Sequence, residues 1–208
     1  MKKFILGTKQ YMTQIFDDAG AAHPATVLSA GPVTITQLKN AERDGYSAVQ
    51  VGYEEQSKKN MPKAKLGHLK DLNLLRHLRE FRLSPDGKET YKRGDTINVS
   101  IFTPGDVVEV SAVSKGKGFQ GVVKRHGFHG GPRTHGQKHS EREPGSIGGA
   151  GRAGGRVAKG MRMAGRMGGD RVTVKNLKVL QVDTEHNRIV LRGAVPGRRG
   201  TLVEIRVK

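Results

Sequence analysis

The sequence predicts a mainly β protein built around a β-barrel. Short runs rich in β-branched residues recur toward both ends of the chain, and turn signals such as Gly31-Pro32 and Asp44-Gly45 separate them. Helical periodicity is scarce. Many short strands joined by turns, with little helix, are typical of a barrel.

The N-terminal half supplies five candidate strands. Residues 4–6 and 11–16 are expected to form two strands joined near Gly7, and further strands are expected at 25–29, 33–36 and 48–53. Residues 58–65 form a basic linker, residues 66–75 a short helix, and the chain is expected to return to strand at 81–83. We therefore predict that residues 22–87 form an inserted α/β subdomain.

A second series of strands is predicted at 96–102, 107–113, 172–182, 188–192 and 201–207. Within the run 172–182, Val172 and Val174 share one face, whereas Leu177 and Val179 take the opposite parity. This slip predicts a bulge near Asn176, as small barrels use at their corners. The barrel is accordingly assigned to residues 1–21, 88–125 and 166–208.

The charge of the chain indicates a polyanionic partner. Thirty-seven Lys and Arg residues oppose 19 Asp and Glu residues, which gives a net charge of +18. Nucleic acid and anionic membrane are the candidates, but the sequence has no apolar run of about 18 residues and no amphipathic helix with aromatic anchors. We therefore expect no membrane partner. The absence of cysteine favours a reducing cytoplasm.

The charge is concentrated in one segment. Residues 113–171 hold thirteen Lys and Arg residues, three acids and seventeen of the 29 glycines, and apolar periodicity is lost from Gly127 to about Lys159. Such a stretch is either a disordered linker or an extension that becomes ordered against a polyanion. Basic residues recur every three or four positions from Arg152 to Arg166, which favours the second hypothesis. Residues 126–165 are predicted to form this extended loop.

Gly116, Gly118 and Gly121 have the spacing of a dinucleotide-binding fingerprint, and with Val123 they also match the glycine-rich pattern of protein kinases. The first pattern needs a helix directly after Gly121. We expect none there, because two valines and then several glycines follow. The kinase pattern needs His-Arg-Asp and Asp-Phe-Gly motifs, which the sequence lacks. A nucleotide-binding enzyme built on this loop is the alternative hypothesis.

Four histidines, His126, His129, His135 and His139, raise the question of a metal site. Zinc sites on loops usually recruit Cys or a framed carboxylate, and in a basic segment His more often contacts phosphates or bases. The acids are scattered, mostly beside Lys or Arg, so no catalytic constellation emerges. We expect no metal, no cofactor, no small-molecule substrate and no enzymatic activity.

Ordered motifs extend along nearly the whole chain: Gly7-Thr8-Lys9, Ala30-Gly31-Pro32-Val33, Ser114-Lys115-Gly116-Lys117-Gly118-Phe119-Gln120-Gly121-Val122-Val123-Lys124-Arg125-His126, Pro144-Gly145-Ser146-Ile147-Gly148, Met163-Ala164-Gly165-Arg166-Met167-Gly168 and Gly193-Ala194-Val195-Pro196-Gly197. In these motifs the sequence resembles the bacterial form of the large-subunit ribosomal protein three family. The resemblance implies a translation-protein-type β-barrel with an inserted subdomain and a long basic internal extension.

The resemblance also implies a function. Members of this family bind 23S rRNA directly, nucleate assembly of the large subunit and send the extension toward the peptidyl-transferase centre of the cytoplasmic ribosome. Ribosomal proteins of families fourteen and nineteen are the implied neighbours. The implied RNA-binding residues are Lys115, Lys117, Lys124, Arg125, His126, His129, Arg133, His135, Lys138, His139, Arg142, Arg152, Arg156, Lys159, Arg162, Arg166 and Arg171.

Overall fold

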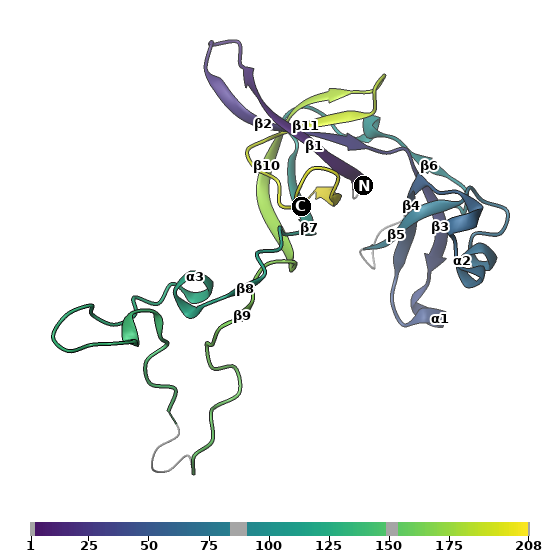
Figure 1. The fold of residues 1–208 in the computed structure, drawn as a ribbon. Helices are drawn as coiled ribbons and strands as arrows, with labels where there is room; N and C mark the ends of the chain where they lie inside the picture. The colour runs from purple at the N-terminus through teal and green to yellow at the C-terminus, as the bar shows by residue number, and fades with distance from the viewer. Residues whose placement is uncertain (1–2, 84–90, 149–153, 208) are drawn as a thin grey trace. The chain divides into compact units, whose positions relative to one another are not determined.

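A computed structural model describes residues 3–83, 91–148 and 154–207 (Figure 1). Its strands are β1 (Phe4–Phe16), β2 (Ala22–Ala30), β3 (Val33–Lys39), β4 (Ala48–Glu55), β5 (Leu75–Arg82), β6 (Thr96–Ile97), β7 (Val107–Val113), β8 (Phe119–Gln120), β9 (Gly165–Arg166), β10 (Arg171–Asp183), β11 (Arg188–Arg192) and β12 (Leu202–Val207). The helices are α1 (Ala41–Asp44), α2 (Lys63–His68) and α3 (Val122–His126), with 3-10 turns η1 (Lys58–Asn60), η2 (Val99–Ile101) and η3 (Ser140–Arg142). The prediction of a mainly β protein is confirmed.

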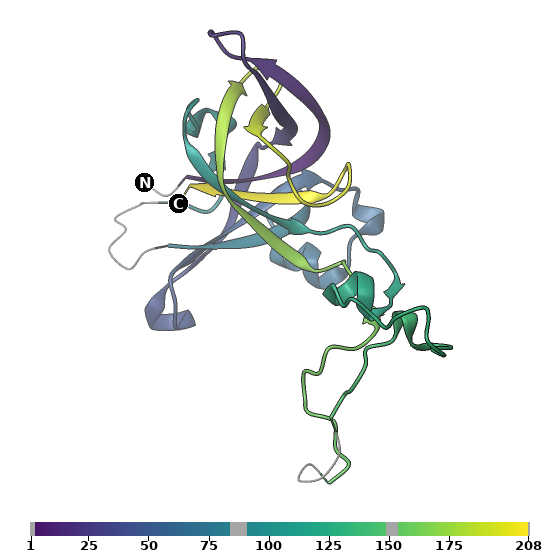
Figure 2. The same cartoon turned by 90° about the vertical axis from the view of Figure 1, so that its left-hand side faces the viewer.

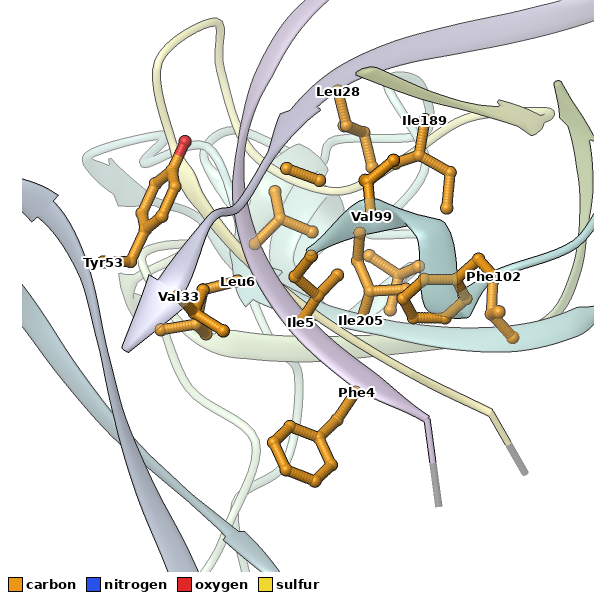
Figure 3. Packing of buried hydrophobic residues seen from close by; sticks show 14 of the residues in the cluster. Phe4, Ile5, Leu6, Leu28, Val33, Tyr53, Val99, Phe102, Ile189 and Ile205 are labelled. Atoms are coloured by element: carbon orange, nitrogen blue, oxygen red, sulfur yellow. The ribbon is translucent and has the colours of Figure 1, made fainter. Parts of the chain in front are cut away.

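Six strands form a closed barrel in the order β1-β12-β7-β10-β11-β2 (Figures 1 and 2). Each neighbouring pair is antiparallel. Ile5 of β1 lies beside Ile205 of β12 and Val99 of η2, all without measurable exposure (Figure 3). Closure leaves no free sheet edge, so the β-branched faces of these strands are buried against one another.

A second sheet has the strand order β5-β4-β3-β6. Successive side chains of a strand point to opposite faces, so Phe4 points away from Ile5 (Figure 3). Phe4 stacks on Phe81 of β5 with ring centroids 4.6 Å apart. Both faces of β1 are therefore buried at this end, and one apolar core includes residues of the barrel and of the second sheet.

Three register shifts interrupt the pairing of the barrel strands, and one of them separates Val179 from Gln181 where β10 pairs with β11. The pairing of β10 with β7 shifts between Val174 and Leu177, and Asn176 between them has a positive φ of 59°. This confirms the bulge that the parity slip predicts. At the other end of the sequence, β1 is a single strand whose register shifts between Lys9 and Tyr11, so the prediction of two strands joined near Gly7 was wrong.

Two predicted boundaries also need correction. Strand β2 pairs with β1 and β11 in the barrel, although residues from 22 onward were assigned to the inserted subdomain. Conversely, β6 pairs with β3 in the second sheet, although residues 88–125 were assigned to the barrel. A strand's partner depends on contacts distant in sequence, which the local pattern of these strands does not encode.

The predicted helix at 66–75 is also displaced, because α2 covers Lys63–His68 and β5 begins at Leu75. Asp71 has a φ of 67°, a left-handed conformation that a helix cannot continue through. Leu69 and Leu75 instead pack with Met61 in a small separate cluster. Among the described residues, no helix is long and apolar enough to cross a membrane.

We predict that Gly7→Ala destabilises the barrel. A Cβ at Gly7 would lie 2.5 Å from the carbonyl oxygen of Ser29, a backbone atom that cannot move without disturbing the pairing of β1 with β2. The free energy of unfolding should fall by about 1–3 kcal/mol, measured by denaturant titration.

The matched control for this change is Gly67→Ala on α2, where an added Cβ meets no atom within 4 Å. Its stability should be unchanged or rise by up to about 1 kcal/mol, because alanine favours helix. Equal destabilisation by both substitutions would contradict the close approach at Gly7.

Candidate nucleic-acid interface

Residues Ser114–Asp170 form a compact unit of their own, distinct from the unit made of Met1–Val113 and Arg171–Lys208. The first and last parts of this segment, residues 114–126 and 163–170, are called its two limbs, and they run antiparallel. The Ser114 amide donates to the Asp170 carbonyl oxygen at 2.8 Å. The Lys117 amide donates to the Met167 carbonyl oxygen at 2.9 Å, and the Met167 amide donates to the Gly118 carbonyl oxygen at 3.0 Å. Strands β8 and β9 then pair, with Phe119 opposite Arg166.

Glycine allows the two limbs to approach this closely. Gly168 has a φ of 74°, and a Cβ at this position would lie 2.2 Å from the Lys115 carbonyl oxygen. Any larger residue would combine an unfavourable left-handed conformation with a backbone clash. The position therefore requires glycine for both reasons.

Helix α3 begins directly after Gly121, so the expectation that no helix forms there was wrong. The Arg125 amide donates to the Gly121 carbonyl oxygen at 3.0 Å, and Gly127, in a left-handed conformation, closes the turn. Val122 is the buried residue of this five-residue helix. The dinucleotide fold is nevertheless not formed, because β8 before the helix is a two-residue strand antiparallel to β9 rather than part of a parallel βαβ unit.

Two side chains of α3 bind the opposite limb. The Arg125 Nη1 donates to the carbonyl oxygen of Met163 at 2.7 Å, and His126 Nε2 lies 3.1 Å from the same oxygen. The Arg125 guanidinium also covers Gly165, where a Cβ would lie 2.8 Å from Nη1. Both residues were predicted to contact RNA, and the structure gives them a role in holding the limbs together.

A pocket of about 410 Å³ opens beside this contact. Basic groups predicted to bind RNA supply much of its wall: Lys115, Lys117, Arg125, His126 and Arg166. Asp170 is the one acid in the lining, and no ion pair of Asp170 occurs among the described residues. The wall of the pocket therefore offers several nitrogen donors of the kind that bind the oxygens of an anion such as phosphate.

Most of the other predicted residues lie exposed within the same unit: Lys124, His129, Arg133, His135, Lys138, His139, Arg142, Arg156, Lys159, Arg162. Arg133 is paired with Glu141, with Nη2 and Oε1 2.6 Å apart, and this is the one ion pair among the described residues of the unit. Arg171 lies outside the unit, on β10, and pairs with Glu204. Arg152 lies outside the described residues.

The four histidines do not converge on a metal site. Among the residues that the structure describes, no group of three or more His, Cys, Asp or Glu side chains could hold a metal ion. His126 is engaged with the Met163 carbonyl oxygen and with the ring of Phe128, whose centroid is 5.9 Å away. The structure therefore gives His126 a role within the protein, whereas His129, His135 and His139 lie exposed.

A second pocket in the unit, of about 460 Å³, was not foreseen from the sequence. Several glycines line this pocket. The other side chains of its lining include aromatic rings, a hydroxyl, a carboxylate and a guanidinium: His126, Phe128, His129, Ser140, Glu143 and Arg162. Glu143 could have been noticed as one of only three acids in a basic segment. Nothing in the local pattern brings it near Phe128 and Arg162.

Comparison with known proteins identifies the family. A family model described as ribosomal protein L3 matches residues 88–189. Large ribosomal subunit protein uL3c of Guillardia theta is 50% identical over 208 residues, which cover 99% of this chain and 100% of that protein. The chain belongs to the ribosomal protein L3 family.

Bacterial members are equally similar. Large ribosomal subunit protein uL3 of Synechococcus sp. (strain JA-3-3Ab) is 51% identical, and that of Herpetosiphon aurantiacus is 50% identical. Each alignment covers 97% of this chain and 94% of the relative. Membership of the L3 family confirms the resemblance that the ordered motifs indicated, and the family model spans the whole unit Ser114–Asp170.

We predict that Arg125→Met loosens the junction of the two limbs. The substitution keeps much of the side chain's length but removes the charged hydrogen bond to Met163, which contributes roughly 1.5–3 kcal/mol. Hydrogen exchange of the Lys117 and Met167 amides, which bond across the limbs, should become roughly tenfold or more faster.

Lys124→Met is the control, since Lys124 lies exposed on the same helix and the substitution removes the same charge. Exchange at Lys117 and Met167 should remain as in the unsubstituted protein. If both variants speed exchange equally, the contact between Arg125 and Met163 does not hold the limbs.

Proposed function

We propose that this protein is a structural constituent of the large ribosomal subunit and that it binds 23S rRNA directly through residues 114–170. The observation that carries the proposal is the uncompensated charge of this unit. Its described residues contain a single ion pair, between Arg133 and Glu141, although basic side chains line a pocket and much of the surface. Relatives of about 50% identity bear the name large ribosomal subunit protein.

The residues of the first pocket and the exposed residues farther along the segment contribute differently to RNA binding. Lys115, Lys117 and Arg166 surround one pocket and position phosphate groups by charge-assisted hydrogen bonds. Farther along the segment, exposed residues such as Arg156 and Arg162 neutralise the RNA backbone. Glycine between them permits close approach of the protein backbone to RNA.

In this proposal the protein acts by shaping RNA and has no catalytic role. The segment 126–165 extends toward the peptidyl-transferase region and supports its RNA, and early binding of the chain nucleates assembly of the subunit. Ribosomal proteins of families fourteen and nineteen are the neighbours we propose. The alternative, a nucleotide-binding enzyme using residues 116–121, is disfavoured because β8 and β9 pair antiparallel there.

The first test is the salt dependence of binding. We predict that the protein binds large-subunit rRNA with a slope of log affinity against log salt of about −4 to −9, as expected for roughly five to ten phosphate contacts. The double substitution Lys117→Gln and Arg166→Gln should make the slope shallower by about 2, because each lost phosphate contact removes about one unit. Filter binding at several salt concentrations measures both.

A control removes the same charge elsewhere. Lys65 and Arg79 lie outside the unit 114–170, and there Lys65 donates to the Arg76 carbonyl oxygen and Arg79 pairs with Glu204. Lys65→Gln with Arg79→Gln should leave the slope close to that of the unsubstituted protein. A slope near zero for the unsubstituted protein would refute the proposal itself.

A deletion separates folding from function. Replacing residues 127–164 with a short Gly/Ser bridge should shift the thermal midpoint by only about a few degrees, since the apolar core that includes the barrel lies outside this segment. The same deletion should impair assembly of large subunits, measured by sedimentation of particles reconstituted with the variant. A shortened protein that assembles normally would contradict the proposed role of the segment.

A further inference from the structure

The negative charge of Glu143 is unfavourable on a surface proposed to bind phosphates. Glu143 lies in the unit Ser114–Asp170, which has twelve Lys and Arg residues and three acids, and a carboxylate there repels the RNA backbone. Glu141, two residues earlier, is neutralised by Arg133. Glu143 forms no ion pair among the described residues and instead lines the second pocket of the unit.

The rest of that pocket suits a flat aromatic ligand. His126 and Phe128 hold their rings 5.9 Å apart at 44°, and both contribute to the wall. Glycine residues 127, 130 and 131 line it as well, so part of the wall is backbone without side chains. A volume of about 460 Å³ admits a nucleobase, and unpaired bases in RNA are typically stacked on aromatic or guanidinium planes.

The polar groups of the pocket discriminate among the bases. An ionised carboxylate only accepts hydrogen bonds, and its two oxygens match two adjacent donors. Guanine presents such a pair, N1–H and the N2 amino group, whereas adenine and cytosine set an acceptor beside their amino group and uracil sets acceptors on both sides of its N3–H. Arg162, in the same lining, supplies donors for guanine O6 and N7.

We propose that this pocket takes an unpaired guanine of the bound RNA, with Glu143 accepting from its N1–H and N2 amino groups. The inference rests on the proposed function and adds to it a base that the protein distinguishes. Phosphate contacts set the affinity of the unit for RNA, and Glu143 makes the protein select guanine at one position of that RNA.

The test compares short single-stranded RNAs by fluorescence anisotropy with the full chain. The probes are an oligouridylate, the same oligomer with one central guanosine, and that oligomer with inosine, which lacks the N2 amino group. The guanosine oligomer should bind about tenfold more tightly than the oligouridylate, and the inosine oligomer should fall between them.

Two variants with the same change of charge isolate the carboxylate. Glu143→Gln should abolish the preference for guanosine, because its amide turns a donor toward the donors of guanine. Glu141→Gln should keep the preference, because the Glu141 side chain pairs with Arg133 rather than lining the pocket. Thermal melting of both variants verifies that they fold, and Glu143→Asp should retain part of the preference.

The outcomes also separate this inference from the proposed function. Binding that depends strongly on salt but is equal for all three oligomers overturns the guanine pocket and leaves the rRNA proposal intact. Equal loss of preference in Glu141→Gln and Glu143→Gln overturns it too, since charge rather than position would then be responsible. Free guanosine monophosphate that binds as tightly as the guanosine oligomer would show a mononucleotide site and refute a site for RNA.

Discussion

The excess of positive charge in residues 114–170 is the constraint on which the rest of this protein depends. Thirteen basic residues face three acids between 113 and 171, and one ion pair, Arg133 with Glu141, is formed among the described residues of the unit. Like charges held this close repel one another, and this stretch buries little apolar surface to oppose that repulsion. Its described residues are therefore held by local backbone bonds and by glycine at close approaches, and we propose that a polyanion supplies the missing charge.

The barrel holds the two ends of this segment in place. Strand β7 ends at Val113 and β10 begins at Arg171, and these two residues are paired across the sheet. The ends of the segment are thus fixed side by side by strands of a closed barrel, so pairing within the barrel offsets the entropic cost of closing the loop. Arg125 then joins the limbs through its hydrogen bond to the Met163 carbonyl oxygen.

Strands β7 and β11 have the bounds that the sequence predicted, because each is a short run rich in β-branched residues next to a turn signal, Gly105-Asp106 before β7 and Gly193 after β11. The position of Gly7 was misjudged for a physical reason: glycine signals a turn, but here it serves the contact between β1 and the Ser29 carbonyl oxygen within a strand. Helix α3 is a single turn, too short for periodicity to reveal. The basic residues of the site were predictable from composition, whereas the pocket at Glu143 depends on residues far apart in sequence and was not.

The central claim is that a polyanion completes the structure of the glycine-rich segment, and amide hydrogen exchange tests it most directly. Exchange across residues 127–148 and 154–164 would be measured in the free protein and again after addition of large-subunit rRNA at low salt. We expect rapid exchange in the free protein and strong protection in the complex, with the barrel strands protected in both. Equal exchange of the segment with and without rRNA, under conditions where binding is complete, would contradict the claim.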